Sequence, residues 1–304
     1  MQFYIMACQE IRCHDVKGRQ ERMPAAEGPE AGYVERRIFI MNETTKYQLM
    51  KNRELLKGYH AGDAGAEETD QQQKLPSISP MKEKIGKGTI SLPKDFQELT
   101  VQGNLLELIA ERKSRRQYQE KNLTLLELSY LLWATQGVRN MAGHKNPVTF
   151  RNVPSAGSRH PFETYLFISR VEGLEKGIYH YLPEKHELEL WEDKKDYETE
   201  LTQALCGQYF AASAPVVFVW SALPYRTEWR YGQKAAKYIL LDAGHVCENL
   251  YLACQSIGCG TCAIGAYDQG CLDERLGFEP GPSGEKDYEC AVYAAPVGKR
   301  KEEL

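Results

Sequence analysis

The stretch Pro154-Ser155-Ala156-Gly157-Ser158-Arg159-His160-Pro161 stands directly before a run of β-branched and aromatic residues. Its two prolines fix φ at both ends and restrict the residue before each of them. Gly157 lacks a Cβ, so the backbone there can take a positive φ or lie against a flat ligand. The run at residues 164–168 predicts a strand. A rigid, donor-rich loop before a core strand is a suitable wall for a planar cofactor, although an ordinary proline–glycine loop has the same composition.

A cationic run lies further upstream, where Arg112-Lys113-Ser114-Arg115-Arg116 places four cations in five residues. Cations at the end of a helix interact favourably with the helix dipole, so a solvated helix end accounts for this run. Guanidinium groups also match the oxygens of a phosphate, and Ser114 adds a hydroxyl donor. The run therefore indicates either a helix end or a phosphate site.

Together the two stretches resemble the flavin-binding motifs of the nitroreductase superfamily. Pro-Ser-Ala-Gly-x-x-His-Pro resembles the flavin-contacting loop of that family, and Arg-x-Ser-x-Arg resembles its flavin-binding signature. The resemblance runs from about residue 105 to residue 300. Within the superfamily, the chain most resembles the SagB-type/ThcOx-type dehydrogenases, which are relatives of the thiazoline/oxazoline oxidases. It implies that FMN is contacted by Arg112, Lys113, Ser114, Arg116, Pro154, Ser155, Ala156, Gly157 and Ser158.

A glycine-rich stretch, GCGTCAIGAY at residues 258–267, follows the longest predicted helix. Because it follows a helix rather than a strand, it does not match a dinucleotide-binding fingerprint. In the family a small-Ile-Gly segment at this place lies against the flavin, and Ala263, Ile264 and Gly265 match it. The resemblance also assigns Lys299 and Arg300, at the end of the last strand, to the phosphate site. A glycine-capped helix end followed by a strand accounts for the stretch as well.

The pair Lys237-Tyr238 lies at the start of the long predicted helix. It resembles the pair implicated as acid and base in azoline-oxidising members of the family. A Tyr or Lys at this place can remove a proton while hydride leaves to the flavin. A lysine extended to solvent beside a core tyrosine is the other interpretation. The pair is thus the candidate catalytic site.

Three cysteines, Cys254, Cys259 and Cys262, have the C-x₄-C-x₂-C spacing of plant-type iron–sulfur proteins. Cys254 falls inside the apolar helix, where a small buried thiol is common. Flavin contact explains the remainder of the segment, and no two of the seven histidines have metal-ligand spacing. We therefore expect no metal, while an iron–sulfur cluster stays as the alternative.

The composition limits the partners of the chain. It has 304 residues, of which 42% are hydrophobic and 26% are charged, and a net charge of −4. An acidic globular chain argues against nucleic acid or an anionic membrane as the main partner. The longest apolar run, residues 214–223, is too short to span a bilayer, and no basic region precedes the first apolar residues. Nine cysteines without an export signal indicate reduced thiols in a cytoplasm.

Two regions are expected from the distribution of sequence patterns. Residues 1–103 read as an N-terminal extension, with one helix within residues 44–59 and a flexible linker or surface arm over residues 61–93. Residues 104–304 read as one nitroreductase-like FMN-binding domain. Strands are predicted near residues 165–168, 177–181, 187–191, 216–220 and 290–297, and helices from Thr124 to Gly137 and over about residues 234–257. The mixed order predicts an α+β fold, which in the family is a mostly antiparallel sheet flanked by helices.

The resemblance implies an FMN-dependent oxidoreductase that transfers hydride between NAD(P)H and an organic acceptor such as a nitro compound or a quinone. It also implies a homodimer with FMN at the subunit interface, formed largely by the long helix. One alternative is an azoline dehydrogenase that oxidises thiazoline or oxazoline rings in a modified peptide. Another, of a different class, is a flavin or iron–sulfur electron carrier.

Overall fold

The computed structural model describes residues 43–58, 68–86, 88–193, 196–281 and 283–301. By its internal contacts the chain divides into two units, Met1–Glu54 and Leu55–Leu304. The described part of the first unit is helix α1 (Glu43–Glu54), which confirms the helix expected within residues 44–59.

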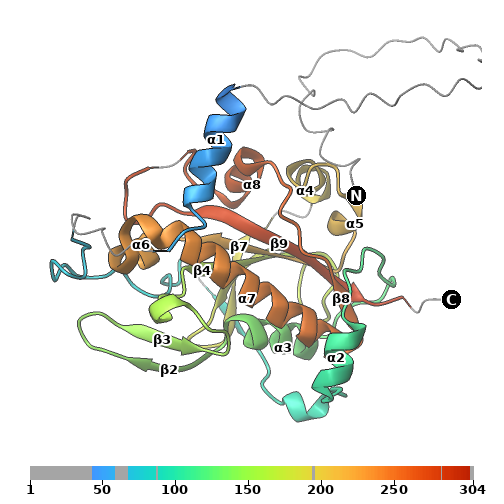
Figure 1. Ribbon diagram of the computed structural model, residues 1–304. Coiled ribbons are helices and arrows are strands. Elements are labelled where there is room, and N and C mark those ends of the chain that lie inside the picture. Colours follow the sequence, from blue (N-terminus) through green and yellow to red (C-terminus); the bar gives the residue numbers. More distant parts are fainter. Residues whose placement is uncertain (1–42, 59–67, 87, 194–195, 282, 302–304) are drawn as a thin grey trace, which may run out of the picture. The chain divides into compact units, whose positions relative to one another are not determined.

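A single seven-stranded sheet forms the centre of this unit (Figure 1). Every strand pairs with its neighbours in antiparallel fashion, which confirms the expected antiparallel α+β fold. In spatial order the strands are β1 (Thr89–Ser91), β6 (Glu187–Glu192), β5 (Gly177–Leu182), β4 (Phe162–Ile168), β7 (Val216–Ala222), β9 (Cys290–Lys299) and β8 (Cys259–Thr261). All residues of β4 and β7 are buried, because helices or connecting segments cover both faces of these interior strands.

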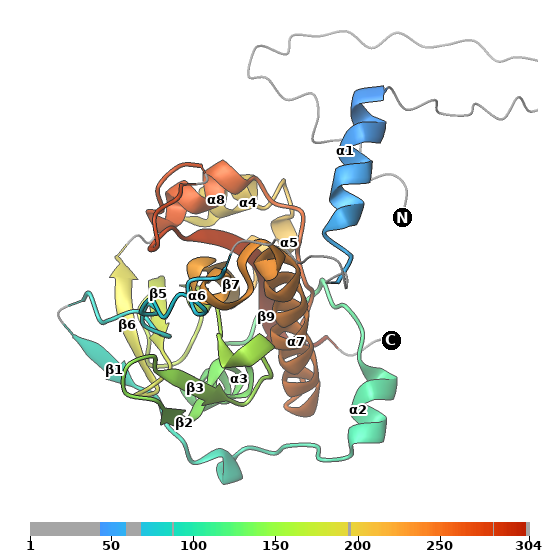
Figure 2. The ribbon, with the colours of Figure 1, turned by 60° about the vertical axis from the view of Figure 1, so that its left-hand side comes forward.

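Alternate residues of β4 contribute to two separate hydrophobic cores, as the two-residue period of a strand requires. Leu166 and Ile168 pack in the first core, toward α3 (Leu125–Gln136) and α7 (Ala235–Ser256). Phe167 packs in the second core, on the opposite face. Three short helices cover that face: α4 (Glu198–Ala204), α5 (Tyr209–Ala212) and α8 (Gln269–Leu276) (Figures 1 and 2).

The two long helices of the first core follow local sequence signals. Thr124 caps α3 with its hydroxyl, and the Glu127 carboxylate accepts the N–H of Thr124, so the predicted capping box is present. Helix α7 has 22 residues and buries one face against the sheet. Its other face is left open by the described residues, since Leu240 and Leu241 are 61% and 50% exposed.

Several further elements complete the unit. Helix α2 (Leu105–Glu111) precedes the cationic run and confirms the helix that the spacing of Leu105, Leu108 and Ile109 predicts. Helix α6 (Tyr225–Tyr231), which the sequence did not predict, precedes α7. A separate hairpin consists of β2 (Val138–Ala142) and β3 (Val148–Arg151). Short 3₁₀ turns occupy Phe96–Glu98, Ala156–Ser158 and Gly232–Lys234. Among the described residues, no helix has the length and apolar character needed to cross a bilayer.

Residues 68–86, here called the strap, are bound to α6 and to the sheet. The indole Nε1 of Trp229 donates to the carbonyl of Leu75 at 2.8 Å, and Nε of Arg226 donates to the carbonyl of Ser79 at 2.9 Å. Strand β1 follows and pairs with β6. Residues 68–103, which we expected to belong to an extension outside the FMN-binding domain, therefore lie within the second compact unit, because they supply an edge strand and main-chain acceptors to it.

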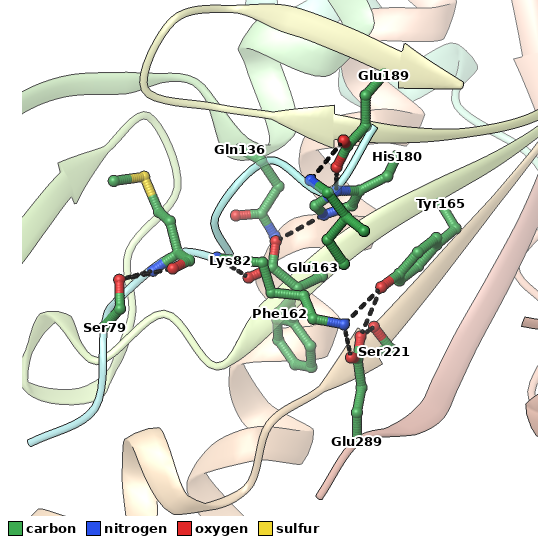
Figure 3. Close-up of polar contacts among 12 residues, drawn as sticks. Ser79, Lys82, Gln136, Phe162, Glu163, Tyr165, His180, Glu189, Ser221 and Glu289 are labelled. Atoms are coloured by element: carbon green, nitrogen blue, oxygen red, sulfur yellow. Dashed lines mark hydrogen bonds and ion pairs between the residues drawn. The ribbon is translucent and has the colours of Figure 1, made fainter. Parts of the chain in front are cut away.

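A buried cluster of charged side chains anchors the end of the strap (Figure 3). His180 on β5 lies between two carboxylates: its Nε2 is 3.1 Å from Glu163 and its Nδ1 is 2.8 Å from Glu189. The main-chain N–H groups of Ile85 and Gly86 both donate to the second oxygen of Glu189. The imidazole ring of His180 thus links two carboxylates on the strands that flank β5, and one of them, Glu189, holds the end of the strap.

Candidate functional site

Three segments predicted to bind flavin meet beside the C-terminal end of α7. The N–H of Arg115 donates to the carbonyl of Thr261 at 2.9 Å, next to the Ala263–Gly265 stretch. The N–H of Arg300 donates to the carbonyl of Gly258 at 3.1 Å. A Cβ on Gly260 would lie 2.6 Å from Cδ of Arg115, so only glycine permits this approach. Main-chain pairing therefore brings together segments that are far apart in sequence.

Tyr251 of α7 connects two of these segments through its side chain. Its hydroxyl lies 2.9 Å from the hydroxyl of Ser114 and accepts the N–H of Ala263 at 2.8 Å. The guanidinium of Arg112 lies over the tyrosine ring, 5.2 Å from its centroid. Sequence reasoning did not identify Tyr251, because nothing in the local pattern of α7 indicates that its hydroxyl meets residues 137 positions away.

Arg112, Ser114 and Arg116 form a group of donors without an acidic partner among the residues that the structure describes. Ser114 and Arg116 are exposed, and Arg112 is half-buried. Within the described parts of the chain, no carboxylate forms an ion pair with either guanidinium. Two uncompensated guanidinium groups around a hydroxyl suit a phosphate, since all three groups can donate to its oxygens. We call these three residues the phosphate grip.

Cys262 lies beside the phosphate grip and is 2% exposed. Burial raises the pKa of its thiol, while the charge of Arg116 and a hydrogen bond from Ser114 lower it in part. The net direction of the pKa shift is upward, which favours the neutral thiol over the thiolate.

The remaining cations assigned to the phosphate site have different surroundings. Lys299 forms an ion pair with Glu127, the carboxylate that also caps α3. Arg300 is half-buried and its carbonyl accepts the side-chain amide of Gln119 at 2.7 Å. Lys113 is exposed. The charge of Lys299 is thus already paired with a carboxylate, unlike the charges of Arg112 and Arg116 among the described residues.

The Ala263–Gly265 segment is anchored by its central residue. Ile264 is 2% exposed and exchanges two main-chain hydrogen bonds with Ala294 of β9, at 2.7 and 3.1 Å. Ala263 is half-buried and Gly265 is exposed. The backbone on either side of the isoleucine is therefore accessible to a ligand, whereas the isoleucine side chain belongs to the core.

The Pro154–Ser158 loop is tied to the N-terminal half of α7 by Asp242. The hydroxyl of Ser155 donates to one carboxylate oxygen at 2.6 Å, and the N–H of Ala156 donates to the other at 3.1 Å. Burial raises the pKa of Asp242, and these two hydrogen bonds partly oppose the rise. Helix α7 carries two carboxylates, Asp242 and Glu248, and the sequence did not indicate that Asp242 is the buried one.

The loop backbone takes conformations that most residues avoid. Gly157, Ser158 and His160 have φ of 56°, 53° and 44°. Positive φ is strained for the two residues that carry a Cβ, and such strain concentrates at ligand sites. A Cβ on Gly157 would lie 2.7 Å from the hydroxyl of Tyr231 and 3.1 Å from Arg230, so the position accepts only glycine. Tyr231 and Arg230 were not identified from the sequence.

The pair expected to be catalytic is connected to this loop through Tyr231. Lys237 donates its ammonium to the carbonyl of Leu56 at 2.8 Å. The ring of Tyr238 lies 4.4 Å from that of Tyr231, whose hydroxyl is near Gly157. Tyr231 therefore stands between Tyr238 and the loop.

The loop and the phosphate grip contact α7 at different places along the helix. Their anchors, Asp242 and Tyr251, are nine positions apart on this helix. At 1.5 Å and 100° per residue they are roughly 14 Å apart along the axis and about half a turn apart around it. One chain thus presents the two sets of residues on opposite sides of α7.

The three cysteines with iron–sulfur spacing are buried free thiols. Cys254, Cys259 and Cys262 are 1%, 0% and 2% exposed. Burial raises the pKa of Cys259 to about 12, with Lys299 opposing the rise. In the part of the chain that the structure describes, no three His, Cys, Asp or Glu side chains are arranged to hold a metal ion.

Comparison with known proteins identifies the family of the chain. The sequence profile of the Nitroreductase family matches residues 109–299. The nitroreductase-like protein MJ1384 of Methanocaldococcus jannaschii is 35% identical over 213 residues, which cover 70% of this chain and 97% of that protein. The trifolitoxin-processing protein TfxB of Rhizobium leguminosarum bv. trifolii is 30% identical over 110 residues, 35% of this chain and 30% of that protein.

A solved structure shows the same fold. The crystal structure of a nitroreductase-like protein from Ralstonia eutropha superimposes with a TM-score of 0.56 and 24% identity, covering 75% of this chain and 96% of that one. The profile covers more than half of the chain, and the archaeal relative is covered almost entirely. The chain therefore belongs to the nitroreductase family of oxidoreductases.

Proposed function

We propose that this protein is an FMN-dependent oxidoreductase that transfers hydride between NAD(P)H and an organic acceptor such as a nitro compound or a quinone. The observation that carries the proposal is the phosphate grip: Arg112 and Arg116 flank Ser114, and no carboxylate of the described chain pairs with the two cations. Family membership supports the same reading.

The residues of this chain fit FMN in two places. The phosphate grip would hold the phosphate by charge-assisted hydrogen bonds. The Pro154–Ser158 loop offers a flat backbone wall, since Gly157 has no side chain and its neighbours are fixed by Asp242. When bound, FMN supplies the hydride chemistry, while the protein binds and orients it and sets its electrostatic surroundings.

We further propose a homodimer in which each flavin is held by both copies. The phosphate grip and the Pro154–Ser158 loop lie about half a turn apart around α7, so they do not face one common space in a single chain. Leu240 and Leu241 of α7 are exposed, as are Leu105, Leu106 and Ile109 of α2. Exposed apolar residues on two helices are typical of a surface that a partner covers.

The purified protein tests the proposal directly. It should be yellow, with flavin absorption bands, and heat should release FMN rather than FAD. It should oxidise NAD(P)H when a nitroaromatic compound or a quinone is present. A colourless protein that does not take up added FMN would overturn the proposal.

A second candidate is an azoline dehydrogenase that acts on a modified peptide. The similarity to the trifolitoxin-processing protein favours it, although the match spans 35% of this chain. This activity would require a thiazoline- or oxazoline-containing peptide and the cyclodehydratase that makes it. Ring oxidation without NAD(P)H turnover would support this candidate over the first.

A further inference from the structure

The hydroxyl of Tyr251 can make Ser114 a hydrogen-bond donor to a bound phosphate. This oxygen accepts the main-chain N–H of Ala263 at 2.8 Å. It also lies 2.9 Å from the hydroxyl oxygen of Ser114, a distance at which either oxygen can be the donor. A hydroxyl has one hydrogen and two acceptor positions, so these two contacts leave two arrangements of hydrogens.

A phosphate selects one of these arrangements. Phosphate oxygens accept hydrogen bonds, so Ser114 must direct its own hydrogen to the anion. The hydrogen between Ser114 and Tyr251 must then come from the tyrosine. The N–H of Ala263 favours this direction, because it polarises the tyrosine hydroxyl as a donor. Backbone, tyrosine and serine then form a chain of hydrogen bonds that ends at the phosphate.

The surroundings of Tyr251 hold its hydroxyl in place. Tyr251 is half-buried in α7, and its neighbour Leu250 is fully buried in the core. Arg112 lies over the face of its ring at 5.2 Å, a separation suited to a cation–π interaction. Ser114 itself is exposed, so a ligand can reach it. One side chain therefore touches both an arginine and the serine of the phosphate grip.

We propose that Tyr251 is a positioning residue for the FMN phosphate, which makes Ser114 a donor and steadies Arg112. This inference rests on the proposed binding of FMN. It predicts that Tyr251 discriminates between FMN and riboflavin, because riboflavin lacks the phosphate. A residue that only stabilised the fold would affect both ligands equally.

The test compares the dissociation constants of FMN and riboflavin for wild type and Tyr251→Phe, by flavin fluorescence quenching in flavin-free protein. The variant keeps the ring and loses the hydroxyl. We expect FMN binding to weaken about ten-fold, the effect of one hydrogen bond, and riboflavin binding to change less than about three-fold. Equal weakening of both ligands, or no change for FMN, would overturn the inference.

A matched control and a double variant sharpen this test. Tyr130 also places its hydroxyl 3.1 Å from a serine, Ser256, between α3 and α7. Tyr130→Phe should leave the ratio of the two constants unchanged. If Tyr251 acts through Ser114, the double variant Tyr251→Phe/Ser114→Ala should bind FMN within about two-fold of Ser114→Ala alone. Full additivity would contradict the hydrogen-bond chain. Wild-type protein that binds neither flavin would overturn the proposed function itself and this inference with it.

Discussion

The carboxylate of Asp242 accepts the hydroxyl hydrogen of Ser155 at 2.6 Å, which joins the Pro154–Ser158 loop to the 22-residue helix α7. The same serine oxygen accepts the N–H of His160 at 2.9 Å, across the residues with positive φ. The strained backbone is thus held from both ends by one hydroxyl and one buried carboxylate. This explains how a loop with unfavourable φ values keeps a single conformation.

Replacing Asp242 should loosen the loop and weaken the binding of FMN and of riboflavin equally, although only FMN carries a phosphate. Asp242→Asn keeps the shape but loses the charge of the acceptor, and hydrogen bonds to charged groups contribute about 1.5–3 kcal/mol. We expect FMN and riboflavin affinities to fall together by about ten-fold or more. Asp273→Asn is the control, since Asp273 is a buried carboxylate of α8 that accepts the N–H of Ala291 at 2.7 Å. A selective loss of FMN alone would contradict the role given to Asp242.

Replacing Arg112, in contrast, should weaken the binding of FMN much more than that of riboflavin. Arg112→Ala removes a guanidinium that no carboxylate of the described chain pairs with, so FMN should bind about ten- to hundred-fold more weakly. Riboflavin affinity should change little. Arg139→Ala, at an exposed position of β2, controls for the loss of one positive charge. Equal losses for both ligands would show that Arg112 acts elsewhere.

The buried group of His180, Glu163 and Glu189 should make folding stability fall at alkaline pH. Burial alone would lower the pKa of His180, but hydrogen bonds to Glu163 and Glu189 and their charges raise it. Because the pKa is higher in the folded state, this stabilisation is complete below the unfolded value of about 6.5 and is lost as pH rises through the folded value. We expect the free energy of unfolding in urea to fall above about pH 6.5, by up to about 1.4 kcal/mol per pH unit.

His180→Gln should remove this slope, whatever its effect on absolute stability. At acidic pH, folding stability should instead fall as the pH is lowered. The charges of Arg226 and His180 outweigh burial and keep the pKa of Glu163 well below its usual value. That stabilisation is present above about pH 4.5 and is lost on further acidification. A wild-type stability that stays constant from pH 6 to pH 9 (about the range of a shifted imidazole) would show that His180 is neutral in the fold.

The buried cysteines should be dispensable for flavin binding. Cys259 and Cys262 are 0% and 2% exposed, and burial raises the pKa of both thiols. We expect Cys259→Ala/Cys262→Ala to keep the flavin spectrum and most activity, with some loss of thermal stability from the two cavities. The measurement is flavin absorbance together with iron and acid-labile sulfide content. Iron and sulfide in the wild type that disappear in the variant would establish a cluster.

The Lys237-Tyr238 pair distinguishes the two candidate reactions. Reduction of a quinone or nitro group can draw protons from water, whereas ring oxidation needs a base to remove a proton from carbon, typically about 10²–10⁴-fold in rate. Under the first reaction, Lys237→Ala and Tyr238→Phe should keep FMN and retain NAD(P)H-dependent turnover within about ten-fold. Steady-state turnover is measured after flavin occupancy has been matched. A hundred-fold loss (about 2.7 kcal/mol) would favour the peptide-oxidising alternative.

Much of the sheet and of the first core could be predicted from local sequence. Residues 216–220 form an unbroken apolar run, and β7 is an interior strand with every residue buried. Thr124 and Glu127 have capping-box spacing, and α3 begins directly after Thr124. These features depend on a few neighbouring residues whose backbone preferences and hydrogen bonds are local. Strands β1 and β8, with three residues each, carried too little local signal.

By itself, then, the sequence determined the family and the antiparallel α+β fold, and it predicted the segments that bind flavin, because these signals are contained in short runs of residues. Only the tertiary structure decided which side chains meet. It placed Tyr251 against Ser114 and Asp242 against Ser155, and it directed Lys299 to Glu127. A side chain's partner across 87 or 137 positions depends on how helices and strands pack together. No local preference of the chain encodes that packing.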